Sequence, residues 1–414
     1  MIHDFLSLFQ TDFYLGVWRF VFATWPVWLP VFLIWLLMRT WLTYKRRAWL
    51  KKTGSILLEI RIPKNTDKSP AAMEMVIEGI WEDVIGTLTD VYIEGALRDV
   101  FSLEIVSLGG EVKFFIWAFP KWKNIIESRI YTHYPGAEVV EVEDYAIKVI
   151  FDPENMNLWG FTTRLVKPDA YPIKTYIDFG LDKPGKEQEE IVDPLAPVLE
   201  YLGILKPGEQ AWIQILIQGH RKEGLQDARI FSKPDWREGI KKEIKKIIEE
   251  ESVVKPKKDQ PFSFLNITET QSETINAIER NSAKLAFDSM VRIVYVAPKD
   301  KYIKVRGVGI VGSMRQFGSK TLNGIRPHQF IPGINYPWEN IFDTRRKYNQ
   351  RTLLEAYKRR SVFNVPFKHV FGKPYVLTTE ELATLFHFPG ATVTTPTLTR
   401  VSSKKAEAPS NLPA

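Results

Sequence analysis

Three glycines in the second half of the chain have the spacing of a dinucleotide-binding loop. Gly307-Val308-Gly309-Ile310-Val311-Gly312 matches the pattern G-x-G-x-x-G at every position. That chemistry needs the first glycine directly after a strand, a helix N-terminus facing pyrophosphate, and an acidic residue about 20 positions further on. The predicted strand before the motif ends near Ala297, and the nearest acidic candidate is Glu339. We therefore interpret the glycines as allowing this segment to pack closely against a sheet.

The next residues, GSMRQFGSKT from Gly312 to Thr321, partly match a phosphate-binding loop. A true P-loop has four residues between its glycines and a lysine directly after the second glycine. Here five residues separate Gly312 from Gly318, and Ser319 stands before Lys320. The sequence therefore predicts that this chain does not hydrolyse nucleotides.

Other catalytic or metal-binding residue types show no useful spacing. The chain has no cysteine, which removes thiolate chemistry and disulfides and fits a reducing compartment. Its six histidines lack metal-site spacing, and we interpret His387 as a packed loop residue. We predict no cofactor, no metal and no enzymatic activity. The alternative is an enzyme with an unrecognised site, which predicts a deep polar pocket with convergent titratable groups between the folded modules.

Basic residues are concentrated near the N-terminus. The net charge is +7, of which residues 1–52 carry +5, so bulk electrostatics give little support to nucleic-acid binding by the remainder. Two further clusters lie on one predicted helix, Asp343–Arg360, together with Tyr348 and Tyr357. They form either a solvated helix face or a patch for nucleic acid or an acidic partner. The cluster residues are Arg345, Arg346, Lys347, Lys358, Arg359 and Arg360.

The N-terminal region predicts a transmembrane helix. Phe20–Met38 is an uncharged run of 19 residues, close to the roughly 20 that a helix needs to cross about 30 Å of hydrocarbon. Pro26 and Pro30 are expected to bend this helix or to lie near its outer end. The residues expected to define the span are Phe20, Trp25, Trp28, Phe32, Trp35 and Met38.

A basic cluster follows the span and sets its expected orientation. Positive charge on the C-terminal flank predicts that the N-terminus lies outside and that the rest of the chain is cytoplasmic, at the inner membrane. A cleaved signal peptide is the alternative, but the first residues are acidic and the apolar run is long. The residues expected to bind lipid headgroups are Lys45, Arg46, Arg47, Lys51 and Lys52.

The first soluble module is predicted to have the order β-α-β-β-α-β, the split arrangement of ferredoxin-like domains. Alternating Ile56, Leu58, Ile60 and Ile62 predict its first strand, and Gly109-Gly110 predicts a hairpin. The remaining predicted elements are helices from Pro70 and Pro120, the hairpin strands Val100–Leu108 and Glu111–Phe119, and extended segments at Ala137–Val142 and Ala146–Phe151.

A second, looser α+β module is predicted to follow and to be related to the first by duplication. Its helix Thr268–Phe287 carries a capping box of Thr268 and Gln271. The other predicted elements are strands at Tyr171–Phe179, Ala211–Gly219 and Met290–Ala297, helices at Asp193–Leu205 and Asp235–Glu250, and a loop at Ser252–Pro261. Beyond it we expect an extended segment at Arg326–Trp338 and a short helix, Thr378–Phe386, capped by Thr378 and Glu381.

The predicted fold is therefore α+β: one transmembrane helix, two ferredoxin-like α/β sandwich modules and an extended C-terminal segment. The predicted domains are residues 1–52, 53–164, 165–320 and 321–390, with a disordered tail at 391–414.

This organisation resembles the membrane-anchored N-terminal region that precedes a type IV secretion or conjugation-type ATPase of the HerA/FtsK superfamily in small-genome bacteria. The segments that carry the resemblance are QFGSKTLNGIRP (Gln316–Pro327), YVLTTEELATLFHFPG (Tyr375–Gly390) and TPTLTRVSSKKAEAPSNLP (Thr395–Pro413). Such relatives continue into an ATPase core with Walker motifs, whereas this sequence stops at Ala414. The resemblance implies a split or truncated motor whose nucleotide chemistry is supplied in trans, and it implies no catalytic residue here.

The expected role is that of a non-catalytic module that tethers a DNA- or protein-translocating ATPase to the membrane and favours ring assembly, with the chain itself forming homo-oligomers. The alternative is a stand-alone membrane scaffold or adaptor with no motor partner. The residues expected to dock the partner are Thr378, Glu381, Leu382, Leu385, His387, Pro389 and Gly390.

Overall fold

The computed structural model describes residues 2–63, 68–182, 193–224, 235–250, 268–331, 336–390 and 400–401. The chain forms two units. Unit 1 consists of Met1–Thr53 and Ile85–Leu97, and unit 2 consists of Gly54–Val84 and Arg98–Ala414. The predicted loop at Ser252–Pro261 and most of the predicted tail lie outside the described residues.

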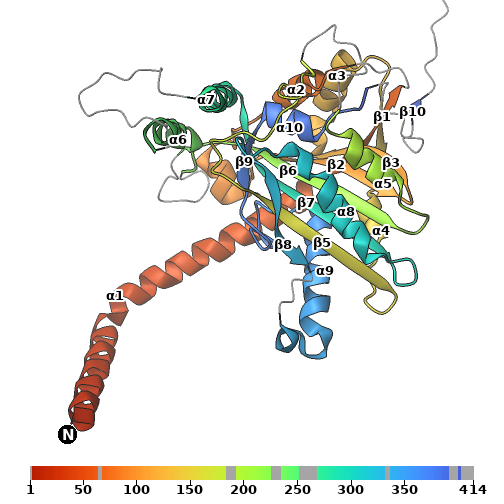
Figure 1. The fold of residues 1–414 in the computed structure, drawn as a ribbon. Helices are drawn as coiled ribbons and strands as arrows, with labels where there is room; N and C mark the ends of the chain where they lie inside the picture. The colour runs from red at the N-terminus through yellow and green to blue at the C-terminus, as the bar shows by residue number, and fades with distance from the viewer. Residues whose placement is uncertain are drawn as a thin grey trace, which may run out of the picture. The chain divides into compact units, whose positions relative to one another are not determined.

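Unit 1 contains one long helix, α1 (Ile2–Thr53), and a short π-helix, η1 (Asp90–Glu94). At 1.5 Å per residue, the 52 residues of α1 extend for about 78 Å, much more than a bilayer requires. Pro26 and Pro30 both lie inside the helix, where each removes a backbone hydrogen bond. Figure 1 shows α1 changing direction along its length, as the prolines predict.

Unit 2 is built on a ten-stranded sheet with the strand order β10-β1-β3-β2-β6-β7-β5-β8. Two further pairings branch from this path, β4 with β1 and β9 with β7. The pairings are antiparallel except for the short parallel contact between β1 and β10. The strands are β1 Ile56–Pro63, β2 Val100–Leu108, β3 Glu111–Ala118, β4 Glu138–Val142, β5 Met156–Leu165, β6 Gln210–Gly219, β7 Ala286–Pro298, β8 Ile325–Ile331, β9 Tyr375–Thr378 and β10 Arg400–Val401.

Two halves of this sheet have the same ferredoxin-like strand order. The first half runs β4-β1-β3-β2 and the second runs β8-β5-β7-β6, so both read 4-1-3-2 by position in their module. Strands β2 and β6 join the halves through nine antiparallel residue pairs centred on Glu104 and Gln214. The halves are therefore related by a pseudo-two-fold axis between these two residues, and the topology confirms the predicted pair of α+β modules.

Helices cover both faces of the sheet (Figure 1). On β2, Phe101 packs on Trp122 beside α3, and the Ser107 hydroxyl donates to the Leu202 carbonyl of α5, so these alternate side chains define one face. The opposite face carries Tyr145 of α4 and Tyr357 of α9 over a common apolar core. The helices are α2 Ala71–Glu78, α3 Lys123–His133, α4 Tyr145–Lys148, α5 Ala196–Gly203, α6 Trp236–Glu250, α7 Glu269–Ser282, α8 Lys304–Ser313, α9 Thr344–Lys358 and α10 Thr379–Leu385.

Helices α6 and α7 are inserted between β6 and β7 of the second module. Thr268 and Gln271 form the predicted capping box at the start of α7. The insertion has its own small core, which consists of Ile240, Ile247, Ile275, Ile278, Ala170 and Tyr171.

Two predicted strands are wrong. Ala146–Phe151 does not extend the sheet, because Asp144 accepts a hydrogen bond from the Ala146 N–H and starts the one-turn helix α4. Tyr171–Phe179 forms turns, because the Asp178 carboxylate accepts from the Thr175 N–H and folds the chain back locally. The first strand of the second module is instead β5, which lies within residues 53–164 that the sequence assigned to the first domain.

The glycines of the dinucleotide-like motif lie inside α8 and not in a loop between a strand and a helix. A Cβ atom added to Gly307 would come within 2.7 Å of the Trp159 ring on β5, and one added to Gly309 would come within 2.0 Å of the Tyr201 ring on α5. These distances confirm close packing at Gly307 and Gly309, whereas Gly312 has nothing within 4 Å of an added Cβ.

Gly309→Ala should therefore destabilise unit 2 by about 1–3 kcal/mol, because Tyr201 is held by its hydrogen bond to the Arg306 carbonyl and must be displaced. Gly312→Ala is the matched control, since nothing lies within 4 Å of its added Cβ. It should stabilise the helix by up to about 1 kcal/mol. Pulse proteolysis in detergent across a denaturant series measures both. Equal stability of the two variants would contradict the packing role of Gly309.

Candidate functional site

Helix α1 presents an uncovered apolar surface. Its segment Leu15–Thr53 is long and apolar enough to cross a membrane, and none of its most apolar part is buried within the protein. The predicted span residues Phe20, Trp25, Trp28, Phe32, Trp35 and Met38 are all exposed. A core helix of a water-soluble protein would be mostly covered. The helix therefore fits a single-pass membrane protein.

The basic cluster after the span is part of the same helix. For a helix along the membrane normal, Lys45 lies about 10 Å beyond Met38 and Lys52 about 21 Å beyond it. The interfacial layer of one leaflet is about 5–8 Å thick. In that orientation the backbone of Lys45 would lie just beyond this layer, within reach of it for a long side chain, whereas Lys51 and Lys52 would lie further out. The Lys45 ammonium lies 4.9 Å from the centre of the Trp41 ring, a cation–π contact typical of this depth.

The two basic clusters of α9 are separated by the structure. Arg345 pairs with Glu339 at 3.2 Å and Lys347 with Glu154 at 2.9 Å, while Arg346 donates to the Asn157 side chain. Lys358 is half-buried and Arg359 is exposed at the other end of the helix. Arg360 is fully buried, so its prediction as part of a surface patch is wrong. The acidic partners reduce the free positive charge that phosphate binding would use.

Arg360 instead forms a buried ion pair on the pseudo-two-fold axis. Its Nε donates to Oε1 of Glu104 at 3.0 Å and its Nη2 donates to Oε2 at 3.1 Å. Both side chains have 0% exposure. Asp144 accepts two further hydrogen bonds from the same guanidinium. We call Glu104, Gln214, Tyr145, Tyr357 and Arg360 the axial cluster.

The axial cluster satisfies the Glu104 carboxylate completely. Besides Arg360, the carboxylate accepts from the Ser102 hydroxyl at 2.7 Å, the Gln214 amide at 3.0 Å and the Tyr145 hydroxyl at 2.8 Å. Burial alone would raise the pKa of Glu104, but the Arg360 charge and these hydrogen bonds outweigh it and hold the pKa below the usual glutamate value. The convergent titratable groups lie between the two modules, yet they are closed to solvent and clamp the modules together.

The predicted docking segment lies in the core. Thr378, Glu381, Leu382, Leu385, His387 and Pro389 are buried, and only Gly390 is half-buried. Phe386 and Phe388 pack edge-on against Phe114 of β3, and Phe388 also contacts Tyr134. His387 is packed as predicted, with its Nδ1 at 2.9 Å from the Ala383 carbonyl and its Nε2 at 3.0 Å from Asp193. The segment is unavailable as an exposed docking element because its apolar side chains complete the first module.

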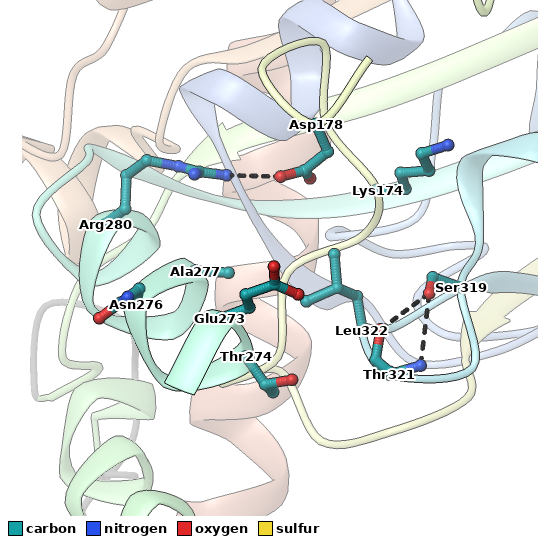
Figure 2. Close-up of a pocket in the computed structure, with 10 residues that line it drawn as sticks. All are labelled: Lys174, Asp178, Glu273, Thr274, Asn276, Ala277, Arg280, Ser319, Thr321 and Leu322. Carbon is teal, nitrogen blue, oxygen red and sulfur yellow. Dashed lines mark hydrogen bonds and ion pairs between the residues drawn. The ribbon is translucent and has the colours of Figure 1, made fainter. Parts of the chain in front are cut away.

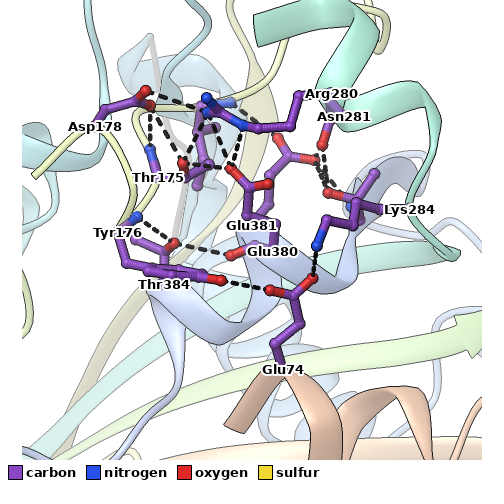
Figure 3. Close-up of polar contacts among 12 residues, drawn as sticks. Glu74, Thr175, Tyr176, Asp178, Arg280, Asn281, Lys284, Glu380, Glu381 and Thr384 are labelled. Carbon is purple, nitrogen blue, oxygen red and sulfur yellow. Dashed lines mark hydrogen bonds and ion pairs between the residues drawn. The ribbon is translucent and has the colours of Figure 1, made fainter. Parts of the chain in front are cut away.

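A buried polar network surrounds α10 and joins four parts of unit 2 (Figure 3). Glu74 of α2 pairs with Lys284 at 2.8 Å and accepts from the Tyr176 hydroxyl at 2.6 Å. Arg280 of α7 pairs with Glu380 at 3.1 Å and with Asp178 at 3.2 Å. Since the members come from α2, α7, α10 and the turns at 171–179, the network fixes the inserted helices and the C-terminal segment to the first module.

Glu381 lies at the centre of this network. Its carboxylate accepts from the Ile173 N–H and the Thr378 N–H, each at 2.9 Å, so it supplies the predicted capping contact with Thr378. Burial nevertheless raises the pKa of Glu381 to about 7, against the effect of these donors.

Glu381 should make stability depend on pH near neutrality. Its folded-state pKa is above its unfolded value of 4.5, so its contribution is full below pH 4.5 and is lost as pH rises through about 7. The unfolding free energy of wild type minus that of Glu381→Gln should fall by up to about 3 kcal/mol between about pH 5 and pH 8. Denaturant titrations of both proteins at several pH values measure this difference. A difference that does not change with pH would contradict the raised pKa.

An open cleft of about 430 Å³ lies between α7, residues 174–178 and the loop at 319–322 (Figure 2). Its wall combines Lys174 and Arg280 with Asp178 and Glu273, and Arg280 and Asp178 neutralise each other. Ser319 and Thr321 of the P-loop-like segment lie here, with their hydroxyls 2.9 Å apart. This segment follows α8 and precedes β8, so it lacks the helix N-terminus that a phosphate cradle requires. The mixed lining does not select a ligand charge.

Sequence reasoning missed Glu104, Gln214 and the network around Glu381. A charged or amide side chain at the centre of strands that are otherwise apolar, as in FSLEIVSL and WIQILIQ, is the signal that could have indicated a buried polar contact. Within the described parts of the chain, no group of three or more His, Asp or Glu side chains could hold a metal ion.

No curated protein matches the chain. A family model described as Domain of unknown function (DUF8128) matches residues 39–400. Because this range covers most of the sequence, the chain belongs to that family.

Proposed function

We propose that the protein is a non-catalytic module, anchored at the inner membrane by α1, that tethers a translocating ATPase supplied in trans. The observation that carries the proposal is the exposed apolar helix that continues without a break into a basic cluster. Such a helix has no stable place in water, and its C-terminal charges favour the cytoplasmic side. Unit 2 would then lie in the cytoplasm with the N-terminus outside.

The ATPase partner is supported by the sequence resemblance, and the non-catalytic role is supported by the kind of polar groups that unit 2 holds. The titratable groups of the axial cluster are closed to solvent and satisfied by one another, as expected of a scaffold. Because the segment at 375–390 is in the core, the residues after Val401 are the part of the C-terminal region that we assign to the partner. Ring assembly through copies of this chain is part of the same proposal.

Orientation is tested with single cysteines, because the natural chain has none. Ser7→Cys should react with a membrane-impermeant maleimide on intact cells, and Ser128→Cys, at an exposed position of α3, should react only after permeabilisation. The reverse pattern would invert the topology. Labelling of both on intact cells, or release of the protein by alkaline carbonate, would contradict membrane anchorage with a cytoplasmic domain.

Partner binding is tested by affinity purification from detergent-solubilised membranes with the full chain and with a chain that ends at Val401. The shorter chain keeps every described strand and helix. We expect the full chain to enrich a Walker-motif ATPase and the shorter chain to lose it. If neither chain enriches an ATPase, the motor proposal fails and the stand-alone membrane scaffold becomes the better account.

A further inference from the structure

Unit 1 contains a second apolar element beside the membrane helix. Residues 88–94 form a short helical turn that includes η1 and lies within the segment Ile85–Leu97. The Trp41 indole N–H of α1 donates to the Tyr92 carbonyl at 2.9 Å. A Cβ atom on Gly95, which has a φ of +82°, would come within 2.5 Å of the Lys45 backbone, so the two backbones are in close contact there.

These contacts define the depth of the segment relative to the span. Trp41 lies three residues, or about 4–5 Å along the helix, beyond Met38, which is inside the interfacial layer of about 5–8 Å. Lys45 lies about 10 Å beyond Met38, just outside that layer. Since Tyr92 meets Trp41 and Gly95 meets Lys45, the segment runs beside α1 and outward through the headgroups. Leu88, one turn before Tyr92, therefore lies toward the hydrocarbon.

The exposed side chains of this segment are Leu88, Thr89, Ile93 and Glu94, so two large apolar side chains reach the surface beside two polar ones. Leu88 is 50% exposed and Ile93 is 57% exposed, while Val91 is fully buried. These two apolar side chains lie beside the part of α1 that leaves the hydrocarbon. Covering them with lipid removes apolar surface from water, which is energetically favourable. The segment adjoins α1 at Trp41 and Lys45, which are residue types that accumulate at the headgroup level.

We propose that residues 88–94 form a second, non-spanning membrane contact, with Leu88 and Ile93 inserted into the cytoplasmic interface of the bilayer. This inference rests on the membrane anchorage proposed above. A single helix can rotate about its axis and tilt freely, whereas a second contact beside it fixes both motions. The segment would thus set the rotation and tilt of α1.

The test places an environment-sensitive nitrobenzoxadiazole label on single cysteines in the full chain. The protein is reconstituted in vesicles of phosphatidylcholine and phosphatidylglycerol that contain a lipid with a nitroxide near the headgroup end of its acyl chain. Leu88→Cys and Ile93→Cys are the test positions. Leu37→Cys, in the span, and Lys52→Cys, at the exposed end of α1, are the references for hydrocarbon and water.

Labels at 88 and 93 should be quenched by the nitroxide lipid at least about twofold more than the label at 52, as expected of interfacial burial. Quenching at 88 and 93 equal to that at 52, with strong quenching at 37, would overturn the second contact and leave the anchor intact. Weak quenching at 37 as well would instead show that α1 does not insert, which defeats the anchorage and this inference together.

Discussion

Arg360→Met should destabilise unit 2 by about 3–5 kcal/mol, because it leaves the Glu104 carboxylate buried without its counter-charge. Arg360 and Glu104 both have 0% exposure, so water cannot replace the lost guanidinium. Methionine keeps much of the volume of the arginine stem, so the loss reports the charge more than a cavity. Denaturant unfolding in detergent, followed by tryptophan fluorescence, measures the change.

The double variant Arg360→Met with Glu104→Gln is the control. Glutamine has the shape of glutamate and can still accept from Ser102 and Tyr145, but it carries no charge that needs a partner. The double variant should therefore be more stable than Arg360→Met alone by at least about 2 kcal/mol. The single variant Glu104→Gln completes the comparison. If the stability lost by the double variant equals the summed losses of Arg360→Met and Glu104→Gln, the two residues are not energetically coupled and the clamp interpretation fails.

A chain that ends at Pro374 should not fold unit 2. It lacks strand β9 and helix α10 together with Leu382, Leu385, Phe386 and Phe388, all of which are buried. Loss of each such side chain costs about 2–5 kcal/mol, so the four together cost about as much as the 5–15 kcal/mol by which a domain is usually stable. It also leaves Glu74, Thr175 and Asn281 without the partners that α10 supplies.

The chain that ends at Val401 is the matched comparison and should fold as the full chain does. Size-exclusion chromatography in detergent and limited proteolysis distinguish the two chains. The chain ending at Pro374 should aggregate and be cleaved rapidly, whereas the chain ending at Val401 should be monodisperse and protease-resistant. A monodisperse, protease-resistant chain ending at Pro374 would contradict the assignment of the C-terminal segment to the core. A truncation at Pro374 also cannot test docking, because loss of binding would follow from loss of the fold.

Elements with strong local patterns could be predicted from the sequence. The apolar run before Arg39, the hairpin at Gly109-Gly110 and the capping box at Thr268 each depend on neighbouring residues alone. The strand order 4-1-3-2 of the first module is the one expected of its predicted order of elements, β-α-β-β-α-β.

Features that depend on distant residues could not be predicted. Glu104 and Arg360 are 256 positions apart, and no local pattern pairs them. Arg360 stands next to Arg359 in the sequence, but its φ of +46° helps to turn the chain after α9. Arg359 is therefore exposed while Arg360 is buried. The segment Thr378–Gly390 contains both acidic and apolar residues, and its burial depends on the network formed with α2 and α7. Strand β5 contains Gly160, where an added Cβ would come within 2.5 Å of the Ile293 carbonyl on the neighbouring strand β7.

The residue pair at the centre of the sheet, Glu104 and Gln214, requires two modules of different sequence. If two identical chains associated through this strand, the same residue would stand on both sides of the axis. The axis would then hold two glutamates or two glutamines, never one of each. Covalent fusion allows Glu104 and Gln214 to differ, so that one arginine neutralises one carboxylate and the amide completes its hydrogen bonding. The asymmetry at the axis is thus available to a fused pair and denied to a homodimer of the same fold.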